Sequence, residues 1–216
     1  MFMSIRLSRG VRGWRSGFAW LLVFCVLFGT WPATSVVAAP RRPYQFPRTA
    51  NLFLKWHLNN DEARALAQDW DVIILDMEVQ GNTPDALRLL RQLNPKAKVL
   101  AYVTAQEVRT DIATNPQTPL RRRLASRIRD AWYLRSTHGD RAAWWPGTWL
   151  LNVTDRAPVV DGARWPDALA GFVADELAPS GLWDGVYYDN LWGGIAWFDR
   201  DALDLDGDGA VESPEV

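Results

Sequence analysis

The chain has 216 residues, with 24 lysines and arginines against 25 aspartates and glutamates and a formal net charge of −1. This balance gives no reason to expect binding to nucleic acid, which favours a strongly basic surface. The chain has one cysteine, Cys25, so it cannot form an internal disulfide framework.

The first 38 residues have the features of a secretory signal peptide. They hold four arginines and no acidic residue, and residues 18–31 form a mostly apolar run that is short for a membrane span. We expect cleavage after Ala38, which keeps Pro40 away from the cut; an uncleaved anchor is the alternative. The mature chain would then carry 20 basic against 25 acidic residues and no cysteine, which excludes thiol catalysis. Its expected location is extracellular or periplasmic.

Beyond a linker at residues 39–48, short apolar runs alternate with segments of helical spacing. The apolar runs predict five strands, at residues 51–57, 71–76, 98–103, 148–153 and 185–189. The helical spacing predicts four helices, at residues 61–70, 83–93, 119–132 and 166–178, the third with a strongly basic outer face. Alternating strands and helices indicate an α/β fold with a parallel sheet covered by helices.

Two architectures fit this alternation, a (β/α)₈ barrel and an open doubly wound sheet. A dinucleotide-binding sheet places a glycine-rich phosphate loop after its first strand, and none follows residues 51–57. We therefore expect a barrel over residues 49–200. A barrel needs eight strands over about 250 residues, so the five predicted strands indicate a barrel that is truncated after about five βα units.

Acidic residues follow the predicted strands, where the carboxyl ends of parallel strands meet at one mouth of a barrel. Asp76, Glu107 and Asp189 are the candidate catalytic residues. Glycoside hydrolysis uses two carboxyl groups about 5 to 9.5 Å apart, one as acid and one as nucleophile or base. Asp189 and Asp76 are the favoured pair, and Glu107 is the reserve acid. The alternative is that an aspartate after a strand, such as Asp76 or Asp189, only caps the following helix.

Tryptophan is unusually abundant, with thirteen in the chain and ten after residue 38. An aromatic ring can stack on the C–H face of a pyranose, while acids and amides bind its hydroxyl groups. Core packing is the alternative for any of these side chains. The candidate substrate-binding residues near the predicted mouth are Trp145, Trp149, Asn190 and Trp192.

Residues 204–215 match the twelve-residue calcium loop of an EF-hand, in which oxygen ligands stand at fixed positions and a glycine stands at the sixth. Residues 191–198 lack a clean amphipathic period, so we expect a structural Ca²⁺ site rather than a calcium sensor. A solvated acidic turn is the alternative. The predicted ligands are Asp204, Asp206, Asp208, the carbonyl of Ala210, Glu212 through a water molecule, and Glu215.

Four stretches resemble a known family: DVIILD at residues 71–76, VLAYVT at 99–104, WWPGTWLLNVTD at 144–155 and WDGVYYDN at 183–190. They are similar to the bacterial barrels of hypothetical glycosyl hydrolase family 15 and, more distantly, to endo-α-1,4-polygalactosaminidase-type barrels. The resemblance covers about residues 48–200. It implies a TIM-barrel fold and a carbohydrate substrate.

The sequence thus predicts an exported, calcium-binding glycoside hydrolase-like protein that acts on a polysaccharide. The alternative is a non-catalytic, secreted, calcium-dependent carbohydrate-binding or surface protein. We expect no nucleic acid partner and no membrane span after signal cleavage. The sequence carries no indication of the oligomeric state.

Overall fold

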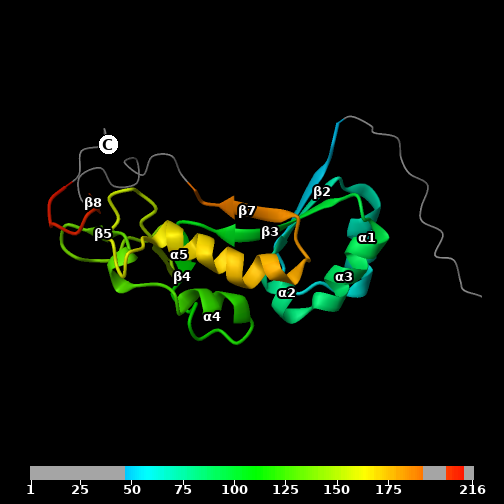
Figure 1. Cartoon of the computed structure of the whole chain (residues 1–216), viewed down its shortest axis with the longest axis horizontal. Coiled ribbons are helices and arrows are strands. Elements are labelled where there is room, and N and C mark those ends of the chain that lie inside the picture. The colour runs from blue at the N-terminus through cyan, green and yellow to red at the C-terminus, as the bar shows by residue number, and fades with distance from the viewer. Residues whose placement is uncertain (1–46, 192–202, 212–216) are drawn as a thin grey trace, which may run out of the picture. The chain divides into compact units, whose positions relative to one another are not determined.

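The computed structural model describes residues 47–191 and 203–211 (Figure 1). The chain divides into two units, residues 1–42 and 43–216, and every described residue belongs to the second. The signal-peptide prediction for residues 1–38 lies outside the described residues. In the described part, no helix is long and apolar enough to cross a membrane.

A four-stranded parallel sheet organises the domain, in the order β1-β2-β3-β7 (Figure 1). The strands are β1 (Ala50–Phe53), β2 (Val72–Asp76), β3 (Lys98–Thr104) and β7 (Gly185–Asp189). Each pairs in parallel with its neighbour. These four strands confirm the predicted α/β class and its parallel sheet.

Helices connect the parallel strands, and their starts follow from local sequence. The Asn59 side chain accepts hydrogen bonds from the amides of Asp61 and Glu62 and so caps the first helix, while proline opens two others. The helices are α1 (Asn60–Asp69), α2 (Glu78–Asn82), α3 (Pro84–Leu93), α4 (Pro119–Ala125) and α5 (Trp165–Phe172).

Two predicted helices take a different form. The helix predicted at 119–132 ends at Ala125. Beyond it, the amides of Arg127 and Ile128 donate hydrogen bonds to carbonyls three residues earlier in the chain, and a separate 3₁₀ turn covers Asp130–Trp132. After α5, a π-helical turn at Val173–Leu177 and a 3₁₀ turn at Ala178–Ser180 complete the fourth predicted helix. Gly181, at φ +65°, ends that segment in the left-handed conformation that favours glycine.

The strand predicted at residues 148–153 does not join the parallel sheet, which corrects the count of five parallel strands to the four described. Its first part, β6 (Thr148–Leu150), pairs antiparallel with β4 (Glu107–Arg109). β4 follows β3 after only Ala105 and Gln106, and α4 lies in the chain between β4 and β6. A second small antiparallel pair joins β5 (Arg135–Ser136) to β8 (Leu203–Asp204). Closure into an eight-stranded barrel therefore stays a prediction.

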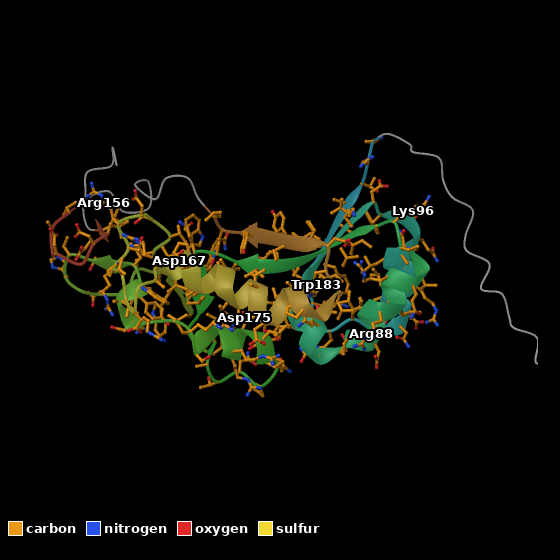
Figure 2. The ribbon with its side chains drawn as sticks, in the orientation of Figure 1. Arg88, Lys96, Arg156, Asp167, Asp175 and Trp183 are labelled. Carbon is orange, nitrogen blue, oxygen red and sulfur yellow. The ribbon has the colours of Figure 1, made fainter. Side chains whose placement is uncertain are left out.

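The helices pack on one face of the parallel sheet. Ile73, Leu75 and Val99 are fully buried against side chains of α1 and α3, and Ala101 and Val103 are fully buried against α4 and α5. Trp183, labelled in Figure 2, precedes β7 and contacts both of these clusters. Its indole N–H donates a 2.6 Å hydrogen bond to Gln80. The core thus fixes the strands whose carboxyl ends carry the candidate site.

Candidate functional site

Two of the predicted acids stand at the carboxyl ends of parallel strands. Asp76 is the last residue of β2 and pairs with Tyr102 of β3, while Asp189 is the last residue of β7 and pairs with Thr104. Parallel strands present their carboxyl ends at the same edge of a sheet. The fold therefore brings both acids to that edge, on either side of β3.

Asp76 is buried and bound to Arg121 of α4. Its two carboxylate oxygens accept hydrogen bonds from Arg121 Nη1 at 2.7 Å and Nη2 at 2.8 Å. Oδ1 also accepts from the amide of Glu78 at 2.9 Å. Both oxygens of Asp76 are thus engaged inside the protein. Arg121 lies in the segment for which the sequence predicts a strongly basic outer face, but its side chain is buried.

Glu78 fixes the start of α4 next to this ion pair. Its fully buried carboxylate accepts hydrogen bonds from the amides of Leu120 at 3.0 Å and Arg121 at 2.7 Å. These amides belong to the first turn of the helix, where N–H groups lack partners within the helix. Burial raises the pKa of Glu78, and the two amides and the Arg121 charge oppose that rise. Glu78 therefore fixes the position of α4 at the edge of the sheet through these two hydrogen bonds.

Tyr102 orients Asp189. Its phenol O–H donates a 2.5 Å hydrogen bond to Asp189 Oδ2, and its ring stacks on Tyr187 with centroids 6.1 Å apart. Burial raises the pKa of Tyr102, and the hydrogen bond and negative charge of Asp189 raise it further. The phenol consequently remains protonated and acts as a donor to one oxygen of Asp189.

Glu107 lies next to Asp189, at the start of β4. Its Oε2 accepts a 2.7 Å hydrogen bond from Nδ2 of Asn190, the residue that follows Asp189 in the chain. Asn190 has φ +53°, in the left-handed region that asparagine enters more readily than most residues. This backbone conformation marks the point where β7 ends, and the hydrogen bond links Glu107 to the residue that follows Asp189.

The environments of the two acids differ. Glu107 is 8% exposed. Its pKa is raised first by burial and also by the negative charge of Asp189, while hydrogen bonds with Thr148 and Asn190 oppose the rise. Asp189 is half-buried and tied to Tyr102 through one oxygen. Two carboxyl groups in unlike environments are the arrangement that acid-assisted bond cleavage uses.

The predicted substrate-binding tryptophans differ in how far their side chains are exposed to solvent. Trp145 is 57% exposed and makes an edge contact with Trp144. Trp149 of β6 is half-buried, with an edge contact to Tyr133 and the Arg141 guanidinium 4.5 Å from its ring centroid. Trp192 lies outside the described residues. Trp145 is therefore the predicted substrate-binding tryptophan with the more exposed ring.

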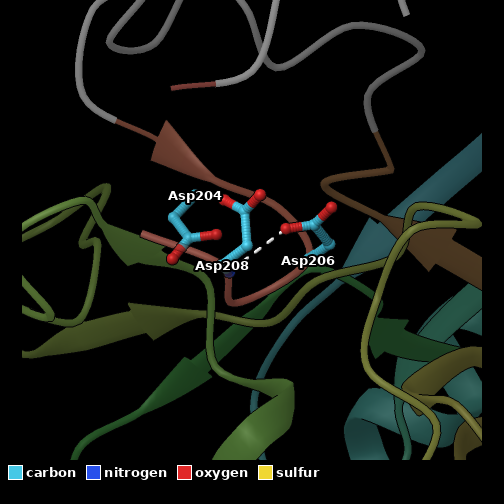
Figure 3. Close-up of side chains that lie close together, drawn as sticks. All are labelled: Asp204, Asp206 and Asp208. Atoms are coloured by element: carbon cyan, nitrogen blue, oxygen red, sulfur yellow. Dashed lines mark hydrogen bonds between the residues drawn. The ribbon is translucent and has the colours of Figure 1, made fainter. Parts of the chain in front are cut away.

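The first three predicted calcium ligands lie close together. Carboxylate oxygens of Asp204, Asp206 and Asp208 all lie within 4.8 Å of one another (Figure 3). The amides of Gly207 and Gly209 donate to Asp204 at 2.7 and 3.0 Å, and both glycines have φ near +85°. Three clustered carboxylates are a donor set that fits a hard cation such as Ca²⁺.

Of the remaining predicted ligands, Ala210 is described and its amide donates to Asp208 Oδ1 at 2.7 Å. Glu212 and Glu215 lie outside the described residues.

The acidic loop is anchored to the antiparallel part of the domain. The loop begins at Asp204, which with Leu203 forms β8, and β8 pairs with β5. Asn152 Nδ2 donates a 2.7 Å hydrogen bond to the carbonyl of Leu205. Leu203 and Leu205 are buried in a small cluster with Leu134 and Leu150. The loop is thus attached to β6, which also pairs with the strand that carries Glu107.

Two residues of the site were not predicted from the sequence, Arg121 and Tyr102. Arg121 stands three residues before the buried Leu124, so it shares a helix face with a core residue. Tyr102 alternates with the fully buried Ala101 and Val103, which directs it to the opposite face of β3. In both cases the periodicity of the buried residues indicates the face of the element to which the side chain belongs.

The sequence pattern of hypothetical glycosyl hydrolase family 15 matches residues 91–214 of the chain. The matched range contains Tyr102, Glu107, Asp189 and Asn190, while Asp76 lies before it. No curated protein matches the chain.

Proposed function

Because the chain belongs to hypothetical glycosyl hydrolase family 15, we propose that it hydrolyses glycosidic bonds with Glu107 and Asp189 as its catalytic groups. The observation that carries this proposal is the pairing of two carboxyl groups in unlike environments at one edge of the sheet. Glu107 is buried, with a raised pKa, beside an Asp189 that Tyr102 holds in place.

In this proposal Glu107 is the general acid. A carboxyl group whose pKa is raised keeps its proton at higher pH and can deliver it to the oxygen of the leaving sugar. Asp189 is the second carboxylate, which either attacks the anomeric carbon or activates a water molecule. The Tyr102 hydroxyl orients Asp189 through Oδ2 and leaves Oδ1 for the reaction.

The sequence favoured Asp76 as a catalytic residue, but in this proposal it has a structural role. Both of its oxygens are bound to Arg121, so proton transfer from Asp76 would first have to break a buried ion pair. We assign Asp76 to positioning, since it holds α4 against the edge where Tyr102 and Asp189 meet. The catalytic pair thus becomes Glu107 and Asp189.

We further propose that the four parallel strands belong to a (β/α)₈-type barrel. Their order follows the chain, and their helices cover one face, as in a barrel wall. The substrate would be a polysaccharide bound at the carboxyl ends of the strands. The exposed ring of Trp145 would stack on a sugar, and Trp149, Trp192 and Asn190 would contribute to the same cleft.

The acidic loop is proposed to bind one Ca²⁺. Asp204, Asp206 and Asp208 would supply carboxylate oxygens, joined by the Ala210 carbonyl, Glu212 and Glu215. The ion would offset the repulsion among the three clustered aspartates and so rigidify the loop that β5 and Asn152 anchor. Export directed by residues 1–38 would bring the loop to an environment in which weak calcium sites can fill.

The alternative is carbohydrate binding without turnover, which the exposed Trp145 also favours. Incubating the protein with a panel of polysaccharides in calcium buffer, and measuring the reducing ends released, distinguishes the two. Release of reducing ends supports the hydrolase. Retarded migration in a polysaccharide-containing gel without any release supports the binding protein, and the absence of both effects contradicts both functions.

A further inference from the structure

The side-chain hydroxyl of Thr148, at the start of β6, contacts two residues that the proposed function uses. Its Oγ1 donates a 2.9 Å hydrogen bond to the carbonyl of Trp145 and accepts one of 3.2 Å from the Trp145 amide. It also forms a hydrogen bond with the carboxyl group of Glu107. One half-buried hydroxyl therefore connects the proposed general acid to the residue with the exposed indole ring.

The register of the β4–β6 pair brings Thr148 and Glu107 to the same face. Arg109 lies opposite Thr148, and Glu107 lies opposite Leu150. Residues two apart in a strand project to the same face, and so do directly opposed residues of an antiparallel pair. Thr148 and Glu107 are therefore diagonal neighbours on one face, a separation that a long side chain can span. The strand pairing itself brings the two side chains together.

The turn that precedes Thr148 is fixed by backbone hydrogen bonds. The Thr148 amide donates to the carbonyl of Trp145 at 3.1 Å, and Gly147 has φ +86°. Pro146 followed by a glycine at positive φ is typical of the two central positions of a type II turn. The Thr110 amide donates to the Gly147 carbonyl at 2.9 Å and so ties the turn to the segment after β4. The backbone thus holds the Thr148 hydroxyl in place.

The chemistry of a hydroxyl group suits it to both protonation states of Glu107. A threonine hydroxyl has one hydrogen to donate and two lone pairs that accept. When Glu107 is ionised, its carboxylate is a stronger acceptor than the neutral Trp145 carbonyl, so the hydroxyl donates to Glu107. When Glu107 carries its proton, the Thr148 hydroxyl can donate to Trp145 and accept from Glu107. The contact is therefore available before and after proton transfer.

We propose that Thr148 is a positioning residue whose hydroxyl holds the Glu107 carboxyl group at a fixed place relative to a sugar stacked on Trp145. Asn190 donates to Glu107 Oε2 from the end of β7, so the carboxyl group is held from two elements. An acid held in this way is already oriented toward the glycosidic oxygen of a bound substrate. The inference rests on the proposed function, in which Glu107 is the general acid.

Kinetics of two substitutions at Thr148 test this role. Thr148→Val deletes the hydroxyl and keeps the branched shape, whereas Thr148→Ser keeps the hydroxyl. On a polysaccharide that the wild type cleaves, Thr148→Val should lower kcat about tenfold with little change in KM, as expected for the loss of one hydrogen bond to a charged group. Thr148→Ser should keep a kcat close to wild type. Thr110→Val, at an exposed threonine nearby, is the matched control and should change neither constant.

The pKa of Glu107 gives a second readout that does not depend on turnover. Thr148→Val removes a hydrogen bond that favours the charged carboxylate, so the pKa of Glu107 should rise, and Thr148→Ser should keep it at the wild-type value. Carbon-13 NMR of the carboxyl group measures both. Thr148→Val changes neither of the nearby charges, Asp189 and the Arg109 guanidinium that Asp111 binds through two hydrogen bonds. The shift would therefore report the hydroxyl.

The two proposals fail in different ways. Wild-type kcat and an unchanged Glu107 pKa in Thr148→Val, beside an inactive Glu107→Gln, overturn the role of Thr148 and leave the proposed function standing. Equal losses of kcat in Thr148→Val and Thr148→Ser also overturn that role, because the hydroxyl would not be the group that matters. Full activity in Glu107→Gln contradicts the proposed function itself. Unchanged circular dichroism in each variant confirms that the fold is intact.

Discussion

Asn190 Nδ2 donates a 2.7 Å hydrogen bond to Glu107 Oε2 and so links the end of β7 to the start of β4. Asn190 makes this contact from a left-handed backbone conformation, with φ +53°, which asparagine enters more readily than most residues other than glycine. The contact ties Glu107 to the chain segment that carries Asp189. It couples the positions of the two proposed catalytic acids.

The pKa of Glu107 should respond in opposite directions to two neighbouring substitutions. Asn190→Gly keeps the left-handed backbone accessible and deletes the hydrogen bond, so the pKa of Glu107 should rise. Asp189→Asn removes a nearby negative charge, so that pKa should fall. Carbon-13 NMR of the glutamate carboxyl groups, assigned with Glu107→Gln, measures both shifts. Glu62, whose pKa is lowered by its Asn59 and Lys55 partners, provides an internal control that should not move.

The raised pKa of Glu107 also predicts a sign for the dependence of stability on pH. The folded state binds the proton more tightly than the unfolded state, so this contribution to stability is fully present below the unfolded pKa of about 4.3. It is lost as the pH rises through the folded pKa. Glu107→Gln should therefore gain stability relative to wild type as the pH rises from below about 4.3 through the folded pKa. An unchanged difference across that range, in urea unfolding at several pH values, contradicts the assignment.

Breaking the ion pair between Arg121 and Asp76 should strongly destabilise the domain. Arg121→Ala leaves two buried carboxylates without their cation, a loss of about 3 to 5 kcal/mol for such pairs. Arg88→Ala, which removes a pair with the exposed Asp85, should cost less than about 1 kcal/mol. Urea unfolding of both variants measures the difference. Equal effects would show that the buried pair does not hold α4 in place.

Calcium should stabilise the folded protein through the acidic loop. A ligand at one hundred times its dissociation constant adds about 2.7 kcal/mol to the free energy of unfolding. We expect thermal melts to shift upward with Ca²⁺ and back with EDTA. Asp204→Asn should abolish this shift, and Asp155→Asn, at an exposed aspartate outside the loop, should preserve it. A calcium-dependent shift that persists in Asp204→Asn contradicts the proposed site.

Asn152 should affect the loop without contacting the ion. Its amide holds the Leu205 carbonyl at 2.7 Å, and Asn152→Ala removes this anchor. Loss of a buried hydrogen bond of this kind costs about 1 to 3 kcal/mol, so calcium affinity measured by calorimetry should fall. Thr154→Val deletes only the hydroxyl bond to Asn152 Oδ1 and should leave the affinity close to wild type. Equal losses in the two variants would argue against the anchoring role.

The βα part of the fold could be predicted because its signals are local. The β-branched run of β2 and the cap at Asn59 both act within a few residues. The direction of the strand at β6 could not be predicted, since an apolar run has the same composition in parallel and antiparallel pairing. β6 pairs with β4, a three-residue strand that the sequence did not predict, and this partner sets its direction.

The acids at the edge of the sheet were among the residues selected from the sequence. Asp76, Glu107 and Asp189 were selected because acids follow strands, and all three lie near the same edge of the sheet. The choice between Asp76 and Glu107 as partner of Asp189 depends on tertiary contacts. Arg121, 45 residues away in the sequence, engages Asp76, and Asn190, 83 residues away, engages Glu107. No local pattern encodes either contact.

The most direct test of the central claim compares the rates of reducing-end release by wild type, Glu107→Gln and Asp189→Asn on a polysaccharide that the wild type cleaves. Removing a general acid or its partner carboxylate lowers rates by about 10²- to 10⁴-fold. We predict a loss of that size in both variants, with calcium affinity and circular dichroism unchanged, and no loss in Asp155→Asn. Full activity in either Glu107→Gln or Asp189→Asn would contradict the account.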